Sequence, residues 1–346
     1  METGKNRRGY EESFFKSRHL RLNDLKEKAR GLGNQYLFKD NIPEYPHPEF
    51  VVSHVRHDTD GKGLGGISED NGFKAPFQDP SSGLGLLWWS LSVGPDEIKS
   101  AERRLLEKTY PKHVEQQEKP LPDQMEEQQE KPLPDQMEEG EKPLPDQKQQ
   151  GFLEKFTTSA AFLKSSRLGS YRFTFPLKDL LEVYREQFCS GSPPVMRVFK
   201  TILYKKTVNY VVLVHSPDQE QFSDYPLLTD NPDAVCTYRD GCFIWRPEAM
   251  SETHGYELIE GPDQMEVKEL FGYDVQFYVW DYISIALHVE DKQVLNFDTG
   301  RLRDNLKFCS EGYPALPGVI FEDFQTAEKL VNKLWPDHPS PLEKDE

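Results

Sequence analysis

The sequence predicts an α+β protein in which a mainly antiparallel sheet packs against a few amphipathic helices and a disordered repeat interrupts the folded body. Runs of strand length recur along the chain, and the helical runs do not alternate regularly with them. Aromatic residues are abundant, with 21 Phe, 15 Tyr and 5 Trp, yet none lies between Val114 and Gln150. The apolar fraction is 36%, below the usual ~45–50%, which indicates that part of the chain stays unfolded.

The first part of the chain, residues 1–31, is basic, with nine Lys and Arg against five acids. It is predicted to be a flexible arm, and a short nuclear or RNA-binding arm is the alternative. The α+β body follows over 32–112, with strands expected at 49–57 and 85–93. A helix is then expected from Pro95, because proline suits the first turn and the acids at 96 and 97 favour its positive end.

The run Gly61-Lys-Gly-Leu-Gly-Gly66 formally matches the GxGxxG pattern of dinucleotide-binding turns and follows a strand. That pattern needs a full helix that crosses to a parallel strand, and Asn71-Gly72 would stop a helix early. The run is therefore predicted to be a flexible loop.

Residues 113–150 contain the clearest repeat of the chain. Glu118-Lys-Pro-Leu-Pro-Asp-Gln recurs at Glu130 and at Glu141, and the segment carries eleven acids against four lysines. Prolines two residues apart prevent a stable helix or a central strand. With almost nothing to bury, the segment is predicted to be an extended, acidic spacer.

The second part of the body, 151–336, is predicted to contain most of the sheet, followed by a flexible tail at 337–346. Strands are expected at 171–175, 195–204 and 208–215, helices at 177–188 and 324–335, a hairpin around Asp240-Gly241, and a second hairpin of 275–289 with 293–297. The sequence leaves open whether the spacer separates two domains or interrupts one. The first hundred residues make a thin core, which favours packing of both parts together.

Composition excludes several classes of function. A formal charge of −17 argues against general binding of nucleic acid or of an anionic membrane. The polar start is unlike a secretory signal, and no run approaches the ~18 apolar residues of a membrane span. Four cysteines without CxxC spacing are expected to be reduced thiols. These features predict a soluble cytoplasmic protein, with the nucleus as the alternative compartment.

The most suggestive motif is His57-Asp-Thr59, which ends a predicted strand and is followed by Ile67 and by Gly72-Phe73. This order resembles the opening of the ADP-ribosyltransferase fold. The resemblance, over about 25 of the 346 residues, implies that His57 and Thr59 line an NAD site. It further implies an aromatic residue or a serine on the next strand and a glutamate on a later one.

Trp88, Trp89 or Ser90 could stand at the position on the next strand, and Glu248 is a candidate for the catalytic glutamate that stabilises the transition state. Without a firm glutamate the site could belong to a pseudo-enzyme. In the plain alternative, His57 merely ends a strand and Thr59-Asp60-Gly61 forms a turn.

Other reactive side chains give weaker signals. Cys189 and His215 could pair as nucleophile and base, but Cys189 is expected at a helix C-terminus, where the dipole disfavours a thiolate. No His or Cys spacing of a metal site is present, so no metal is predicted. Tyr278, Trp280 and Tyr282 would share one face of a strand, either as core or as a binding platform.

Two functions follow from the sequence. The leading prediction is a non-catalytic, intracellular protein-interaction or regulatory protein, without a cofactor and with a protein partner. The alternative is an ADP-ribosyltransferase-like NAD-binding enzyme or pseudo-enzyme.

Overall fold

The computed structural model describes residues 2–5, 11–16, 18–21, 24, 27, 47–75, 78–79, 82–109, 151, 153–154, 157, 159–204, 207–247, 249–251, 256–260, 265–269, 277–279, 282–290, 292–312, 315–338 and 340–345. The repeat spacer and Glu248 lie outside this part of the chain, so the statements about them stay predictions. Within it, no helix is long and apolar enough to cross a membrane.

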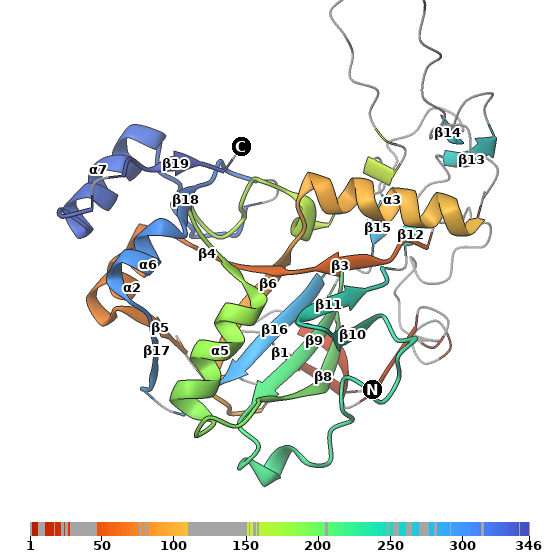
Figure 1. The fold of residues 1–346 in the computed structure, drawn as a ribbon, viewed down its shortest axis with the longest axis horizontal. Helices are drawn as coiled ribbons and strands as arrows, with labels where there is room; N and C mark the ends of the chain where they lie inside the picture. The colour runs from red at the N-terminus through yellow and green to blue at the C-terminus, as the bar shows by residue number, and fades with distance from the viewer. Residues whose placement is uncertain are drawn as a thin grey trace, which may run out of the picture.

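A ten-stranded sheet forms the centre of the molecule (Figure 1). Its strands, in spatial order, are β1 (Glu2–Lys5), β2 (Glu11–Lys16), β8 (Val195–Tyr204), β9 (Thr207–His215), β16 (Tyr282–His288), β6 (Leu86–Ser92), β4 (His54–Thr59), β7 (Tyr171–Pro176), β18 (Leu306–Phe308) and β19 (Glu343–Lys344). Neighbours are antiparallel except at β9–β16 and β18–β19, which confirms the α+β class with a mainly antiparallel sheet.

Strands from both sides of the spacer lie next to each other in this sheet. β6 precedes the spacer and pairs with β16, while β4 pairs with β7, and both partners follow it. The two parts of the body therefore contribute strands to one sheet.

The helices pack around this sheet. They are α2 (Gly61–Asp70), α3 (Pro95–Thr109), α5 (Leu177–Phe188), α6 (Thr299–Asp304) and α7 (Phe324–Leu334), with short 3-10 turns η3 (Ala160–Phe162) and η4 (Glu220–Phe222). In Figure 1, α2, α6 and α7 gather at one end of the sheet, and α5 lies beside its central strands. The predicted helices at 95, 177 and 324 are confirmed, because each buries its apolar stripe, as α5 does with Leu180 and Tyr184.

Smaller sheets complete the fold. One contains β3 (Phe50–Val52), β11 (Cys242–Trp245) and β10 (Cys236–Arg239); the pairs are β5 (Gly72–Lys74) with β17 (Val294–Asn296), β12 (Ala249–Ser251) with β15 (Phe277–Val279), and β13 (Tyr256–Glu260) with β14 (Met265–Glu269). The predicted hairpin of β10 and β11 is confirmed. Asp240 and Gly241 both have positive φ, 52° and 84°, as a two-residue hairpin turn requires.

The central sheet buries apolar side chains on both faces. Along β6, Leu87, Trp89 and Leu91 belong to the larger core, which also contains α5 and the β3–β11 sheet. Alternate residues point the other way, where Leu86 joins a smaller core and Trp88 packs against it. We call this second group the smaller core; its buried members are Leu86, Phe199, Val211, Leu213, Phe222 and Ala286.

Two predicted strand assignments are corrected. The single strand expected at 49–57 is broken at Ser53, and its halves enter different sheets as β3 and β4. The Ser53 carbonyl instead accepts the backbone N–H of Leu177 at 2.7 Å. The hairpin of 275–289 with 293–297 is not formed, because β9 and β6 occupy both edges of β16 while β17 pairs with β5.

Both ends of the chain differ from the flexible segments that the sequence predicts. Residues 2–5 and 11–16 are strands, and β2 pairs with β8 through Phe14 and Phe15, both nearly fully buried. In the tail, β19 pairs with β18, and Leu342 is 3% exposed. In these described segments, the edge of the sheet accepts the backbone and a few apolar residues are buried against it.

Candidate functional site

The glycine-rich run after β4 is a helix, α2, and not the flexible loop predicted from the sequence. Asp60 caps it, with its Oδ1 accepting the N–H of Gly63 at 2.9 Å, and Asn71 ends it in the left-handed conformation. Leu64 and Ile67 are buried. Glycine at 63 is required by close packing, since a Cβ there would lie 2.0 Å from Thr59 Oγ1.

His57 lies on the face of β4 that points into the larger core. Its ring contacts the rings of Phe73 and Trp89 at centroid distances of 5.1 and 5.4 Å, and its Nδ1 lies 2.9 Å from the Trp88 carbonyl oxygen. That oxygen can only accept, so Nδ1 carries the proton. Burial lowers the pKa of His57 despite this bond and the nearby Asp58 charge. The ring is therefore held neutral among aromatic side chains.

The other residues of the predicted NAD site are divided between the two faces of the sheet. Trp88 packs on the smaller core, 6.0 Å from the Lys200 ammonium, and Ser90 alternates with Trp89 along β6. Trp89 is thus the β6 side chain that the structure brings to His57. Thr59 ends the same strand and packs against the first turn of α2.

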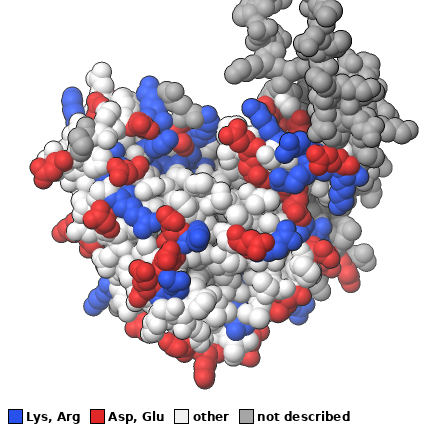
Figure 2. Space-filling model, viewed as in Figure 1, with Lys and Arg blue, Asp and Glu red and all other residues white. Residues whose placement is uncertain are grey.

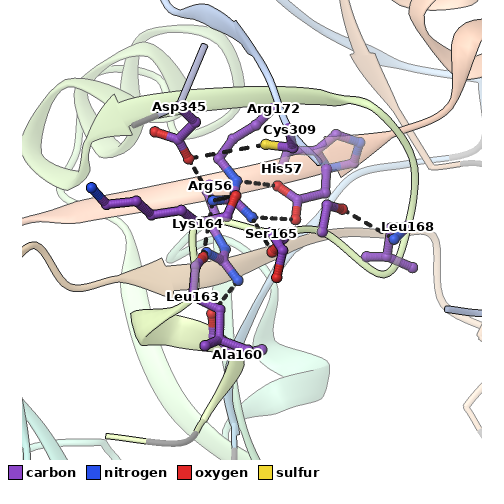
Figure 3. A network of polar contacts seen from close by, with 12 residues as sticks. Arg56, His57, Ala160, Leu163, Lys164, Ser165, Leu168, Arg172, Cys309 and Asp345 are labelled. Atoms are coloured by element: carbon purple, nitrogen blue, oxygen red, sulfur yellow. Dashed lines mark hydrogen bonds and ion pairs between the residues drawn. The ribbon is translucent and has the colours of Figure 1, made fainter. Parts of the chain in front are cut away.

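The opposite face of β4 carries a buried polar network, which Figure 3 shows. Arg172 on β7 faces Asp58 across the β4–β7 pairing, and its Nε and Nη2 donate to the two carboxylate oxygens at 2.8 and 2.9 Å. Its Nη1 donates to Asp345 Oδ2 at 2.6 Å. Bidentate pairing of this kind is the strongest form of ion pair available to arginine. Arg172 is only 2% exposed, so the pairing is necessary for its burial.

Further donors of the two arginines bind backbone carbonyls of η3 and of the loop that follows it, which we call the 163–168 loop. Arg172 donates to the carbonyls of Leu163, Lys164 and Ser165 at 3.1 to 3.2 Å. Arg56 donates to Leu163 at 2.7 Å and also to Ala160. Two guanidinium groups thus fix a segment without helix or strand geometry, as the dashed lines in Figure 3 show.

Electrostatics within the network favour its ionised form. Burial would raise the pKa of Asp58, but the hydrogen bonds and charges of Arg172 and Arg56 hold it below its ordinary value. Conversely, Asp58 raises the pKa of Arg172 in spite of burial. Cys309 Sγ lies 4.0 Å from Asp345 Oδ2, and burial raises the pKa of this thiol to about 12, so it stays protonated.

Sequence reasoning missed Arg56 and Arg172. A signal was present, since Val55-Arg56-His57-Asp58 and Tyr171-Arg172-Phe173 each alternate charged and apolar residues, as strands with two different faces do. What the alternation could not supply was the register that places residue 58 opposite 172.

The sequence favours a structural role for Cys189 over a pairing with His215 as nucleophile and base, and the structure gives the two residues different contacts. Burial raises the pKa of Cys189, while His215 Nε2 accepts a hydrogen bond from Arg197 Nε at 3.0 Å. In the part of the chain that the structure describes, no three His, Cys, Asp or Glu side chains are grouped as metal ligands. The side chains of Tyr278, Trp280 and Tyr282 lie outside the described residues.

Comparison of the chain with models of known protein families, with curated proteins and with solved structures finds no match.

Proposed function

We propose that this chain is a non-catalytic, intracellular protein-interaction or regulatory protein, and that its protein partner contacts the 163–168 loop. The observation that carries this proposal is the exposure of Leu163 and Leu168, 39% and 43%, on a loop whose backbone two buried arginines hold. Apolar side chains gain free energy when a partner buries them. A fixed geometry increases that gain, because less conformational entropy is lost on binding.

The energetics of the network support a positioning role. A buried ion pair stabilises a fold no more than well-packed apolar residues of the same volume would. Beyond the pairing with Asp58, the donors of Arg172 and Arg56 bind carbonyls of the 163–168 loop, which they hold against the sheet. Functional loops are commonly positioned by a rigid scaffold in this way. On the face shown in Figure 2, positive and negative side chains are intermixed.

The test replaces both exposed leucines, Leu163→Asp with Leu168→Asp, and uses Leu227→Asp as a matched control. Leu227 is 38% exposed and lies in a different loop. Proteins crosslinked to the wild type, the double variant and the control are quantified side by side after circular dichroism has verified each fold. We expect a defined set of partners that the double variant loses and the control keeps. An unchanged set for the double variant contradicts the proposal.

A second candidate function is that of an ADP-ribosyltransferase-like NAD-binding enzyme or pseudo-enzyme. The observation that favours it is the order β4–α2–β5, in which the strand carrying His57 and Thr59 leads to a helix with buried Ile67 and then to Phe73, which contacts His57. Under this candidate, His57, Thr59 and an aromatic residue or Ser90 of β6 bind NAD. Glu248 is the proposed glutamate that stabilises the transition state.

Calorimetric titration with NAD and transfer of labelled ADP-ribose distinguish this candidate from the first. His57→Gln removes the imidazole and keeps a polar side chain of similar size, and His54→Gln, at an exposed position of the same strand, is its control. Binding or transfer that His57→Gln abolishes and His54→Gln preserves supports the NAD site. Absence of both signals in the wild type rejects it and leaves the interaction protein.

A further inference from the structure

The segment between β9 and β10 covers the smaller core. Within it, η4 places Phe222, 2% exposed, against the rings of His215 and His288 at centroid distances of 4.7 and 5.0 Å. Tyr225 packs edge-on against Phe199, which comes from the bulge of β8. This segment, residues 217–225, which we call the cover, therefore keeps a group of large apolar side chains out of water.

Arg197 on β8 ties the cover to the sheet. Its Nη1 donates to the carbonyls of Tyr225 at 2.5 Å and Ser223 at 3.3 Å, and its Nε donates to His215 Nε2 at 3.0 Å. The guanidinium thus bridges the covering segment and the last residue of β9. Two backbone bonds join the next residues to β8 directly, from Val198 to Pro226 and from Leu228 to Met196, both at 2.9 Å.

The bridge requires one protonation state of His215. Its Nδ1 lies 2.7 Å from the Ser216 carbonyl oxygen, which can only accept, so Nδ1 carries a hydrogen. Its Nε2 faces the Nε–H of Arg197, which can only donate, so Nε2 must carry a lone pair. A second proton on the ring would replace this hydrogen bond with two opposed donors and two like charges.

The surroundings of His215 disfavour that second proton. His215 is 2% exposed, and the charges that act on its ring come from Arg197 and His288, which both oppose its protonation. Burial is the largest cause, and together these effects lower the pKa of His215 to about 4, against 6.5 for an ordinary histidine. The hydrogen bond to the Ser216 carbonyl raises the pKa of His215, but burial and the two charges outweigh it.

Other ionisable groups nearby act on different atoms. Asp218 accepts the Ser216 hydroxyl at 3.5 Å, and Glu290 acts on His288. Cys189 and Tyr184 pack below the same turn, and burial raises the pKa of each, so both stay neutral. At the far end of the segment, His19 Nε2 lies 3.0 Å from the Leu227 carbonyl, beyond the part that Arg197 holds.

We propose that protonation of His215 in mild acid breaks the bridge from His215 through Arg197 to Tyr225 and releases residues 217–225 from the smaller core. Residues 226–228 stay paired with β8 through their backbone bonds. Release would expose Phe222, Tyr225 and Phe199, so that an apolar surface covered at neutral pH becomes accessible in acid.

Linkage gives the size of the effect. With a pKa of about 4 in the closed form and the ordinary 6.5 in the open form, the opening equilibrium rises roughly 70-fold between about pH 7.5 and about pH 4.5. Hydrogen exchange of the full chain, followed by mass spectrometry and corrected for the intrinsic effect of pH, measures this ratio for peptides within 217–225. Peptides of β9 and β16 report on global unfolding.

Matched variants identify the titrating group. His215→Gln provides an uncharged acceptor for Arg197, and we expect it to remove most of the dependence of exchange on pH; the remainder belongs to His288, whose ring also contacts Phe222 and whose pKa burial also lowers. His54→Gln, exposed and distant, should preserve that dependence. Arg197→Gln should leave 217–225 open at both pH values while β9 stays protected. Three outcomes would each overturn the proposal. The wild type could protect 217–225 equally at both pH values, acid could remove protection from the whole sheet, or His215→Gln could keep the pH dependence of the wild type.

Discussion

Arg172 and Lys200 are both buried cations, each 2% exposed, and the fold satisfies them differently. Arg172 binds Asp58 through two hydrogen bonds, binds Asp345 through a third, and fills its remaining donor positions with loop carbonyls. Lys200 lies 3.2 and 3.3 Å from the two oxygens of Asp79, and aromatic rings surround its ammonium, with that of Phe199 at 5.1 Å.

The difference follows from the shapes of the two cations. A planar guanidinium has five donors in fixed directions, so it can join several chain segments at once. An ammonium is a compact charge that tolerates ring faces as partners. Arg172 therefore joins the 163–168 loop, β4 and the C-terminal residues, whereas Lys200 binds one carboxylate and packs against aromatic rings beside the smaller core. Four predictions test this contrast, from the largest expected effect to the smallest.

Arg172→Met should cost the most, about 3–5 kcal/mol of unfolding free energy, because it leaves the buried Asp58 carboxylate with one partner fewer. Urea unfolding of wild type and variant measures the difference. Adding Asp58→Asn should recover a large part of the loss, since it removes the uncompensated charge. A loss below about 1 kcal/mol for the single variant would mean that the network contributes little to stability.

Acid should weaken the same network by titrating Asp58, whose folded pKa is lowered by Arg172 and Arg56. A lowered folded pKa means that the contribution is complete above the ordinary value of 3.8 and is lost as the pH falls through the folded pKa. Urea midpoints in steps between about pH 5 and about pH 2.5 measure this slope. Asp58→Asn should flatten it, and an equally steep slope in that variant would assign the acid sensitivity to other groups.

Lys200→Met should be milder, about 1–2 kcal/mol, because a thioether packs well against the rings of Phe199 and Trp88. Asp79 keeps a hydrogen bond from the Ser82 hydroxyl at 2.7 Å, so its carboxylate retains a partner. The measurement is again urea unfolding. A cost equal to that of Arg172→Met would remove the distinction between the two cations.

Asp345→Asn should have the smallest effect, about 0.5–1 kcal/mol, since its carboxylate is 22% exposed and an amide oxygen can still accept from Arg172. Hydrogen exchange at β19 reports the change locally. We expect faster exchange there and an unchanged 163–168 loop, which Asp58 and the other carbonyl bonds continue to hold. Faster exchange in that loop would show that Asp345 has a larger part in the network than Asp58.

Most elements could be predicted because their cause is local. The helix of 177–188 has its apolar stripe at helical spacing, and Asp240-Gly241 supplies the two positive φ angles of a tight turn. The glycine-rich run failed as a prediction because glycine lowers helix propensity, while the compensating contacts are tertiary. Gly61 and Gly63 permit the close approach of Glu322 and Thr59.

In the candidate site, too, contacts between residues close in sequence could be predicted, and contacts between distant strands could not. His57 lies near the end of β4 and its ring contacts Phe73, while its role in binding NAD stays a prediction. The sequence did not decide which of Trp88, Trp89 and Ser90 lies beside His57. Alternation with a period of two shows which residues share a face of the strand, but not which face points towards His57. The pairing of Asp58 with Arg172 depends on a register between strands 114 residues apart.

By itself, the sequence determined several of the main helices and strands, the mainly antiparallel class and the alternation of side chains in β4 and β7, because each depends on the periodicity of neighbouring residues. The tertiary structure alone decided that both parts of the chain share one sheet, that the ends join it, and that Arg172 meets Asp58. These depend on pairing between distant strands, where burial of the whole face selects one register among many that the local pattern permits.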